Sequence, residues 1–528
     1  MSSSKPYQNP ADDDDSEPEM IAEDDVQEVV EEVDGDGDVP MDSDDEGQEE
    51  ELVLENDGIA YFDQHKDSVF AIAQHPVYPN LIATGGSEGD ADDAPGKGYI
   101  IDIAAAPSKP VLPPSYNSDP SSAGAWQPTE LQPVFAIDGH TDSINALTFT
   151  LPRGDFLVSG GMDGRLRVYA VGVPSTGTGA QFKFIGESQE TEEVNWVSPC
   201  PSAAHPNTIA LGASDGSVWV FAVDPASDPS NPIQIIQSYF LHTASCTAGA
   251  WSSDGLLLAT VSEDSSLHVF DVFGEAGAKN LVTDNGQTVV SLADADQRFF
   301  VEGGLYSVAI SPSGGLVAVG GAQGAIRVVG LPRLSAQPTS QRQTAQRAVP
   351  VQRGPAGRRA APSSHPSSVQ SDPSAGAGVV LAALNVQSDG VESLSFSPQQ
   401  PLLAAGSVDG SIVVFDAARS FAVRKHIRGA HEGESVVKVD FVRAATGATA
   451  GWLLTSCGLD GVVRRWDLRG ATATQEAVAS GQTAGLIKEW KGHRGGGEGG
   501  GVLGFVQGAD GERVVTAGDD SVVLVFEA

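Results

Sequence analysis

The run DGHTDSINALTFT at Asp138–Thr150, followed by FLVSGG at Phe156–Gly161 and MDGRLRVYA at Met162–Ala170, decides the fold. In each run, apolar residues alternate with polar or small residues, which is the pattern of half-buried strands. The Asp-Gly pair between the second and third runs is a tight-turn signal. We therefore predict three antiparallel strands in this unit, with a fourth strand in the connection to the next unit.

The same sequence motif is repeated along the chain, and such a repeat predicts one supersecondary unit for each copy. The clear copies are SGGMDGRLRVYA (Ser159–Ala170), GASDGSVWVFA (Gly212–Ala222), TVSEDSSLHVFD (Thr260–Asp271), AGSVDGSIVVFD (Ala405–Asp416), SCGLDGVVRRWD (Ser456–Asp467) and TAGDDSVVLVFE (Thr516–Glu527). Two weaker copies are TGGSEGD (Thr84–Asp90) and VGGAQGAIRVVG (Val319–Gly330). Four-stranded units in this number predict an all-β fold, a β-propeller of eight blades, with seven as the fallback if a weak copy merges with a neighbour.

The last copy stops after its third strand, VVLVFEA, so its blade needs a fourth strand from elsewhere in the chain. The segment GIAYF at Gly58–Phe62 has the required apolar pattern and precedes the first unit. We predict that it closes the ring by pairing with the last blade, because closure removes the remaining open sheet edges.

Charge divides the chain into two regions, both acidic. The formal net charge is −41; residues 1–57 hold 24 Asp and Glu against one Lys, and the rest hold 47 acids against 29 bases. Residues 1–51 are predicted to be a disordered acidic tail, and residues 52–528 to form the propeller. The acidic folded region argues against direct binding of nucleic acid and favours a basic partner.

Two insertions interrupt the spacing of the repeats. Residues 104–130 are rich in Pro, Ser and Ala, and residues 331–378 contain six Arg and one Asp. Both are predicted to be mobile loops. The second is a basic segment in an acidic chain, and it either folds back on the acidic surface or is a low-complexity expansion.

No constellation for catalysis, metal binding or a cofactor is present, so we expect a binding protein and not an enzyme. GDADDAPGKG at Gly89–Gly98 lacks the first Gly and the Ser or Thr of a phosphate-binding loop. The three cysteines are widely spaced, which predicts reduced, buried thiols in a cytoplasmic or nuclear protein. We expect neither a signal peptide nor a membrane span.

Acidic side chains should gather on one face of the propeller, formed by the loops that enter each first strand and by the turns between second and third strands. Few Lys or Arg occur on these loops, with Lys66 and Arg494 as the main exceptions. Two aromatic residues near the same face could stack on Arg or Lys. The predicted peptide-binding residues are Glu88, Asp142, Glu190, Glu192, Glu193, Glu263, Glu302, Asp389, Glu392, Glu434, Asp519, Phe70 and Tyr306. General surface charge is the alternative explanation.

The repeat resembles the WD-repeat family, in which Gly-His and Trp-Asp pairs bracket each unit. Gly139–His140, Gly492–His493 and Trp466–Asp467 match these pairs, whereas the third, fifth and sixth units lack the His. The resemblance implies buried hydrogen-bonded sets in two units: His140, Ser159 and Asp163, with Tyr169 in place of Trp, and His431, Ser456, Asp460 and Trp466.

Three longer stretches are similar to the angio-associated migratory cell protein family: His65–Ala91, Gly139–Tyr169 and Glu192–Phe221. The resemblance implies a monomeric chaperone that is located in the cytoplasm, with the nucleus as a second location. It would bind the basic N-terminal segment of a newly made large-subunit ribosomal protein and deliver it for ribosome assembly. Two alternatives stay open: a generic interaction scaffold, such as a ubiquitin-ligase substrate receptor, and a histone chaperone.

Overall fold

A computed structural model describes residues 56–89, 91, 94–108, 127–174, 179–334, 376–444, 446–470, 485–496 and 499–528. These residues belong to the compact unit Leu54–Ala528. The tail predicted at residues 1–51 lies outside the described residues, as do the central parts of the loops predicted at 104–130 and 331–378.

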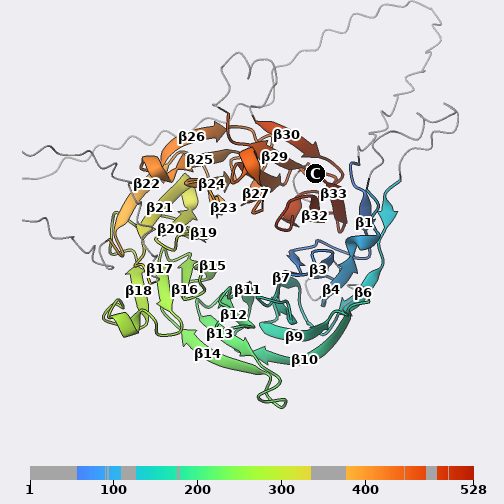
Figure 1. The fold of residues 1–528 in the computed structure, drawn as a ribbon, viewed down its shortest axis with the longest axis horizontal. Coiled ribbons are helices and arrows are strands. Elements are labelled where there is room, and N and C mark those ends of the chain that lie inside the picture. Colours follow the sequence, from blue (N-terminus) through green and yellow to red (C-terminus); the bar gives the residue numbers. More distant parts are fainter. Residues whose placement is uncertain are drawn as a thin grey trace, which may run out of the picture. The chain divides into compact units, whose positions relative to one another are not determined.

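Eight sheets follow one another around a ring, which confirms the predicted all-β propeller with eight blades and not seven (Figure 1). We number the blades 1–8 in chain order, starting with the sheet that begins with β2. The first strand of each blade lies toward the centre of the ring, where it contacts the first strands of the neighbouring blades.

The first strands are β2 (Ala71–Gln74), β7 (Ile144–Phe149), β11 (Val194–Pro199), β15 (Cys246–Trp251), β19 (Leu305–Ile310), β23 (Val391–Phe396), β27 (Val436–Phe441) and β31 (Val502–Val506). The second strands are β3 (Leu81–Ser87), β8 (Phe156–Gly161), β12 (Thr208–Ala213), β16 (Leu257–Ser262), β20 (Leu316–Gly321), β24 (Leu402–Ser407), β28 (Leu453–Gly458) and β32 (Arg513–Gly518).

The third strands are β4 (Gly96–Asp102), β9 (Arg165–Gly172), β13 (Val218–Val223), β17 (Leu267–Asp271), β21 (Ala325–Gly330), β25 (Ile412–Asp416), β29 (Val463–Asp467) and β33 (Val523–Glu527). The outer strands of blades 1–7 are β6 (Pro133–Ile137), β10 (Gln181–Gln189), β14 (Ile233–Tyr239), β18 (Thr288–Leu292), β22 (Val380–Asn385), β26 (Ala422–Ile427) and β30 (Leu486–Trp490). In the described residues, helical structure is limited to the 3-10 turns Ile103–Ala105, Gly277–Lys279, Ala322–Gly324, Ala417–Arg419 and Gly447–Thr449.

The turn between the second and third strands needs a residue with positive φ, which explains the recurring Asp-Gly pair. Gly164 has a φ of +70°, and a Cβ there would lie 2.1 Å from the backbone oxygen of Thr191 in the next entering loop. Blades 4 and 8 reach the same conformation without glycine, through Ser265 (φ 63°) and Ser521 (φ 65°). The turn therefore persists where the sequence phrase is weaker.

The N-terminal segment closes the ring, as the sequence predicted. β1 (Ala60–Phe62) pairs antiparallel with β33 and supplies the outer strand of blade 8. The structure adds a strand that the sequence did not predict, because β5 (Thr129–Glu130) pairs in parallel with the outer edge of β1. The borders of the loop predicted at 104–130 are therefore fixed to the propeller, and Ala106 at its other border is buried in the core.

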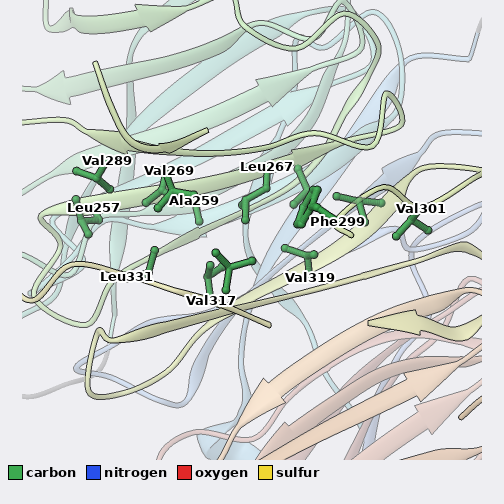
Figure 2. Packing of buried hydrophobic residues seen from close by; sticks show 14 of the residues in the cluster. Leu257, Ala259, Leu267, Val269, Val289, Phe299, Val301, Val317, Val319 and Leu331 are labelled. Atoms are coloured by element: carbon green, nitrogen blue, oxygen red, sulfur yellow. The ribbon is translucent and has the colours of Figure 1, made fainter. Parts of the chain in front are cut away.

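The hydrophobic core is divided among the gaps between blades. Eight clusters of buried side chains occur, and each joins two neighbouring sheets. Figure 2 shows the cluster between blades 4 and 5, where Leu257, Ala259 and Val269 face Val317 and Val319. A blade thus buries its apolar surface only against its neighbours, so the ring gains its full core when all eight contacts are made.

The long connections leave the propeller on the face opposite to these turns. The connection from a third to a fourth strand starts at the end of the third strand that lies away from the turn. The connections that follow β4, β9, β21 and β29 therefore begin on that opposite face.

Candidate functional site

The entering loops and the turns of each blade lie on one face of the ring, which we call the turn face. A backbone N–H in the turn donates to a carbonyl in the entering loop of the same blade in seven blades, with N···O distances of 2.9–3.3 Å. The pairs are Met162 to Ser143, Ser214 to Glu193, Glu263 to Ser245, Ala322 to Gly304, Val408 to Gly390, Leu459 to Ser435 and Asp519 to Gly501. Glu263 and Asp519 therefore occupy equivalent places on this face.

A buried hydrogen-bond chain holds the loops of blade 7. The Trp466 indole donates to the Ser456 hydroxyl at 2.9 Å, and His431 contacts Ser456 through Nε2 and Asp460 through Nδ1, both at 2.8 Å. Because a carboxylate only accepts, His431 carries its proton on Nδ1, and Nε2 accepts from Ser456. Burial lowers the pKa of His431 despite Asp460, which keeps the imidazole neutral.

Blade 2 contains the equivalent contacts, with one difference. His140 lies 3.0 Å from Asp163 and 2.8 Å from Ser159. Burial alone would raise the pKa of Asp163, but hydrogen bonds from His140 and the Thr141 backbone outweigh it and lower that pKa. Tyr169, expected in the place of the Trp, donates instead to the backbone carbonyl of Asp138 at 3.2 Å.

The sixth blade has a substitute for the missing His that the sequence reasoning did not find. The Gln387 amide donates to the Ser411 carbonyl at 2.9 Å and contacts the Ser411 hydroxyl at 3.2 Å. The next residue, Ser388, donates its backbone N–H to Asp409, as Thr141 does to Asp163 in blade 2. The spacing from Gln387 to Asp409 equals that from His242 to Asp264, and this was the available sequence signal.

The predicted acidic residues are spread around the turn face. The loops that enter blades 2, 5, 6 and 7 carry one predicted residue each: Asp142, Glu302, Asp389 and Glu434, respectively. The loop that enters blade 3 carries Glu190, Glu192 and Glu193. The turns of blades 1, 4 and 8 carry Glu88, Glu263 and Asp519, respectively. Glu392 was predicted on a loop, but it is the second residue of strand β23. Glu88, Asp142, Asp519 and Tyr306 are half-buried, and the other predicted residues are exposed.

Four of the predicted residues come together where blades 4, 5 and 6 meet. The Tyr306 hydroxyl donates to the Gly303 carbonyl at 2.6 Å. Its pKa is raised by desolvation and then by three carboxylates, those of Glu392, Glu263 and Asp389. Desolvation and the Asp389 charge raise the pKa of Glu392. We use the name acidic pocket for this surface cluster of three exposed carboxylates around the half-buried Tyr306. Like charges held together in this way favour a cationic ligand.

Other acidic residues of the face already have partners. Glu88 pairs with Lys66 at 2.6 Å, and Asp519 accepts from the Ser68 hydroxyl at 2.5 Å and the Gly499 backbone at 2.6 Å. Within the described residues, Glu193, Glu263 and Glu392 form no ion pair. These three carboxylates are therefore free to meet a basic ligand.

In blades 2 and 7, arginines that were not named from the sequence lie near the face. Arg165 donates to the Gly139 carbonyl at 3.3 Å, and Arg167 pairs with Glu187. Arg464 is buried against Asp460 and contacts Glu489 at 2.7 Å. These three bases therefore compensate part of the negative charge of the face in blades 2 and 7.

A ring of bulged residues surrounds the centre of the turn face. In blades 2–8 the second residue of the first strand has no partner in the pairing with the second strand, because the register shifts there. Phe70 holds the corresponding place in blade 1, just before β2. The ring residues are Phe70, Asn145, Asn195, Thr247, Tyr306, Glu392, Val437 and Leu503.

Burial separates the ring residues sharply from their neighbours. The residue before each of them is 0% exposed in all eight blades, while every ring residue is accessible to solvent. β-bulges re-aim side chains in this way next to binding sites. Phe70, Tyr306 and Glu392 were predicted as site residues, whereas the sequence reasoning did not identify Val437 and Leu503. An alignment of the eight first strands would have exposed the pattern.

Other types of site have no support in the part of the chain that the structure describes. No group of three or more His, Cys, Asp or Glu side chains there could hold a metal ion. The three cysteines are buried, and burial raises the pKa of the Cys246 and Cys457 thiols to about 12. None of the described helices could cross a membrane.

Comparison with known proteins finds the same repeat and a consistent set of relatives. The WD domain, G-beta repeat, matches residues 131–170, 233–271 and 378–416. The chain is 26% identical to ribosome assembly protein SQT1 of Saccharomyces cerevisiae over 512 residues, covering 93% of this chain and 91% of the yeast protein. It is 23% identical to human angio-associated migratory cell protein over 471 residues, covering 89% and 80%.

Solved structures give a stronger likeness. Sqt1 from Chaetomium thermophilum is 63% identical, with a TM-score of 0.74, over 90% of this chain and 98% of that one. The same protein bound to the N-terminus of the ribosomal protein L10 is 64% identical, with a TM-score of 0.73, over 90% of this chain and all of that one. Both the identity and the coverage extend over nearly the whole propeller.

Proposed function

This chain belongs to the Sqt1 family of WD-repeat proteins, and we propose that it is a dedicated chaperone for a basic large-subunit ribosomal protein of the L10 type. It binds the N-terminal segment of that protein on the turn face and delivers it for assembly of the large ribosomal subunit. The observation that supports this most directly is the family member bound to the L10 N-terminus. Binding, without chemical conversion, is the whole of the activity.

The acidic pocket provides the chemistry for a basic segment. Arg and Lys side chains of the cargo would pair with the free carboxylates of Glu193, Glu263 and Glu392, and Arg can form bidentate contacts with each. The Tyr306 ring lies beside the carboxylates of Glu263 and Glu392 and can stack on a guanidinium. A disordered basic segment loses conformational entropy when it binds, and several charge-assisted contacts offset that cost.

The capture takes place where the cargo is made. Ribosomal proteins are translated in the cytoplasm, and a basic segment that is covered early cannot bind RNA or other polyanions non-specifically. We therefore place this protein in the cytoplasm, as a monomer with one turn face for each cargo molecule.

A charge-reversal experiment tests the proposal. We expect Glu193→Lys, Glu263→Lys and Glu392→Lys together to abolish binding of a synthetic L10 N-terminal peptide, measured by isothermal titration calorimetry. The matched control combines three charge reversals, Glu275→Lys, Asp284→Lys and Glu512→Lys. All three are exposed and lie in connections on the opposite face, so the control should bind as the unmodified chain does.

Two results would contradict the proposal. Binding that survives the triple reversal would place the site elsewhere. A histone tail that binds as tightly as the L10 peptide, at equal charge and length, would favour the histone-chaperone alternative. Circular dichroism and gel filtration should show that the triple variant stays folded, because substitutions at exposed sites cost only about 0.5 kcal/mol each.

A further inference from the structure

The eight ring residues divide into two arcs. In blades 2–4 the side chain braces the next blade: Asn145 donates to the Val194 carbonyl at 2.7 Å, Asn195 to the Cys246 carbonyl at 3.0 Å, and Thr247 to the Leu305 carbonyl at 2.7 Å. Each acceptor is the first residue of the neighbouring first strand. These three side chains therefore hold neighbouring blades together.

The other five ring residues make no such brace in the described structure and follow one another through blades 5, 6, 7, 8 and 1. Tyr306 and Glu392 belong to the acidic pocket. The next three are apolar: Val437, Leu503 and Phe70. We call these three the apolar arc. Blades 8 and 1 meet directly, since the Val69 backbone donates to the Gly518 carbonyl at 3.0 Å, so the arc is continuous across the closure of the ring.

Two of the three residues of the apolar arc, Phe70 and Leu503, lie outside the folded core. Phe70 is 43% exposed and, like Leu503, lies outside all eight core clusters, whereas Val69 and Val502 immediately before them are 0% exposed. Val437 packs only at the edge of the cluster between blades 7 and 8. Exposed apolar residues rimmed by charge mark interaction sites, and this arc adjoins the acidic pocket.

We propose that the apolar arc is a second subsite of the turn face, which binds a large apolar side chain of the captured basic segment. The inference rests on the proposed function, and it narrows the cargo from any polycation to a basic segment with at least one large apolar residue. The acidic pocket attracts the segment through charge. The apolar arc selects among basic segments, because burying a Phe or Leu side chain favours the bound state regardless of charge.

The salt dependence of binding separates the contribution of the acidic pocket from that of the apolar arc. Raising salt from roughly 0.1 M to roughly 1 M shortens the Debye length from about 10 Å to about 3 Å, which screens the exposed carboxylates. Apolar contact is not weakened by this screening. Binding that remains at high salt therefore reports the apolar arc, and binding that is lost reports the acidic pocket.

The experiment uses short Arg- and Ser-containing peptides in which one Phe is moved through the sequence, with an all-Ser peptide of equal charge as reference. At high salt we expect the best Phe peptide to bind the full chain about tenfold more tightly than the reference. Phe70→Ser combined with Leu503→Ser should remove this preference while leaving the affinity for the reference unchanged at low salt. Val77→Ser, which alters a 51% exposed apolar side chain in the connection between β2 and β3 on the opposite face, is the control and should keep the preference.

The possible failures are distinguishable. If every peptide binds at low salt but no Phe position improves binding, the apolar subsite is overturned and the proposed function stands. A preference that persists in the Phe70→Ser, Leu503→Ser variant also overturns it, because the selectivity then lies elsewhere. If no peptide and no L10 segment binds at any salt concentration, both proposals fail.

Discussion

One hydroxyl in blade 7 connects two buried side chains, those of Trp466 and His431. Ser456 accepts from the Trp466 indole and donates to Nε2 of His431, and all three residues are fully buried. In three other blades a Thr contacts the equivalent His: Thr84, Thr260 and Thr516. The stability of this hydrogen-bonded set therefore depends on a hydroxyl group at the position of Ser456, which either Ser or Thr can supply.

Ser456→Ala should destabilise the chain by about 2–3 kcal/mol, because it leaves a buried indole N–H and an imidazole nitrogen unpaired. Urea unfolding followed by Trp fluorescence would measure the change. Ser456→Thr keeps the hydroxyl and should cost far less. If the two variants were equally unstable, packing volume and not hydrogen bonding would control this site.

His268 should make the fold sensitive to mild acid. Burial, then the His242 charge, lower its pKa from 6.5 to about 4, and its Nε2 has no hydrogen-bond partner. Between these pH values the unfolded chain binds a proton that the folded chain excludes, so stability is full above pH 6.5 and falls as the pH drops toward 4. From neutral pH to about pH 5.5, His268 alone should cost about 1 kcal/mol.

A substitution that cannot titrate isolates this contribution. His268→Gln should flatten the decline in the unfolding midpoint between neutral pH and about pH 5.5. Phe270→Leu, in the same strand, should lower stability equally at both pH values. An unchanged pH dependence in His268→Gln would assign the acid sensitivity to other groups, such as His65, whose pKa burial also lowers to about 4.

At the scale of elements, β1 is the strand on which the ring depends. It inserts between β33 and β5, and it brings Ile59 and Phe62, both 0% exposed, into the core between blades 8 and 1. The sequence predicted this strand because an apolar run stood just before the first unit and the last unit lacked one. It could not predict β5, whose two residues pair through backbone groups with no side-chain pattern of their own.

The same contrast explains what the sequence predicted of the candidate site. Turn positions follow from the repeated phrase, so Glu263 and Asp519 were placed correctly on the turn face. The bulges depend on a shift in strand register, which leaves no trace in composition or alternation. Glu392 was therefore expected on a loop, and Val437 and Leu503 were not named. Gln387 was missed because a different side chain makes the contact usually made by His.

Deletion of residues 1–63 should unfold the chain at a much lower temperature, whereas deletion of residues 1–51 should leave the midpoint nearly unchanged. The longer deletion removes β1, and the loss of Ile59 and Phe62 alone costs roughly 2–5 kcal/mol each. Differential scanning calorimetry of both deletions is the measurement. Equal midpoints would mean that blade 8 is stable with three strands.

For the whole molecule, charge should control how fast cargo arrives more than how long it stays. The formal net charge is −41, and residues 1–57 account for −23 of it. A field of this size steers a basic segment toward the face at long range. The contacts that slow dissociation are short-range ones, in the acidic pocket and the apolar arc.

Removing residues 1–51 should therefore lower the association rate of an L10 N-terminal peptide several-fold at low salt and leave its dissociation rate unchanged. Stopped-flow fluorescence would give both rates. At high salt the two chains should associate at the same rate, which serves as the internal control. A faster dissociation after the deletion would show that the acidic N-terminal residues contact the cargo directly.

The pairing of β1 with β33 also determines when the propeller can close during the protein's own synthesis. β1 is made before every other described strand and its partner after all of them, so at about 5–20 residues per second β1 waits roughly 20–90 s for β33. Blade 8 supplies Asp519 and Leu503, and until it forms the turn face is an open arc. The complete turn face, with both the acidic pocket and the apolar arc, is therefore present only after the last blade has been translated and has paired with β1.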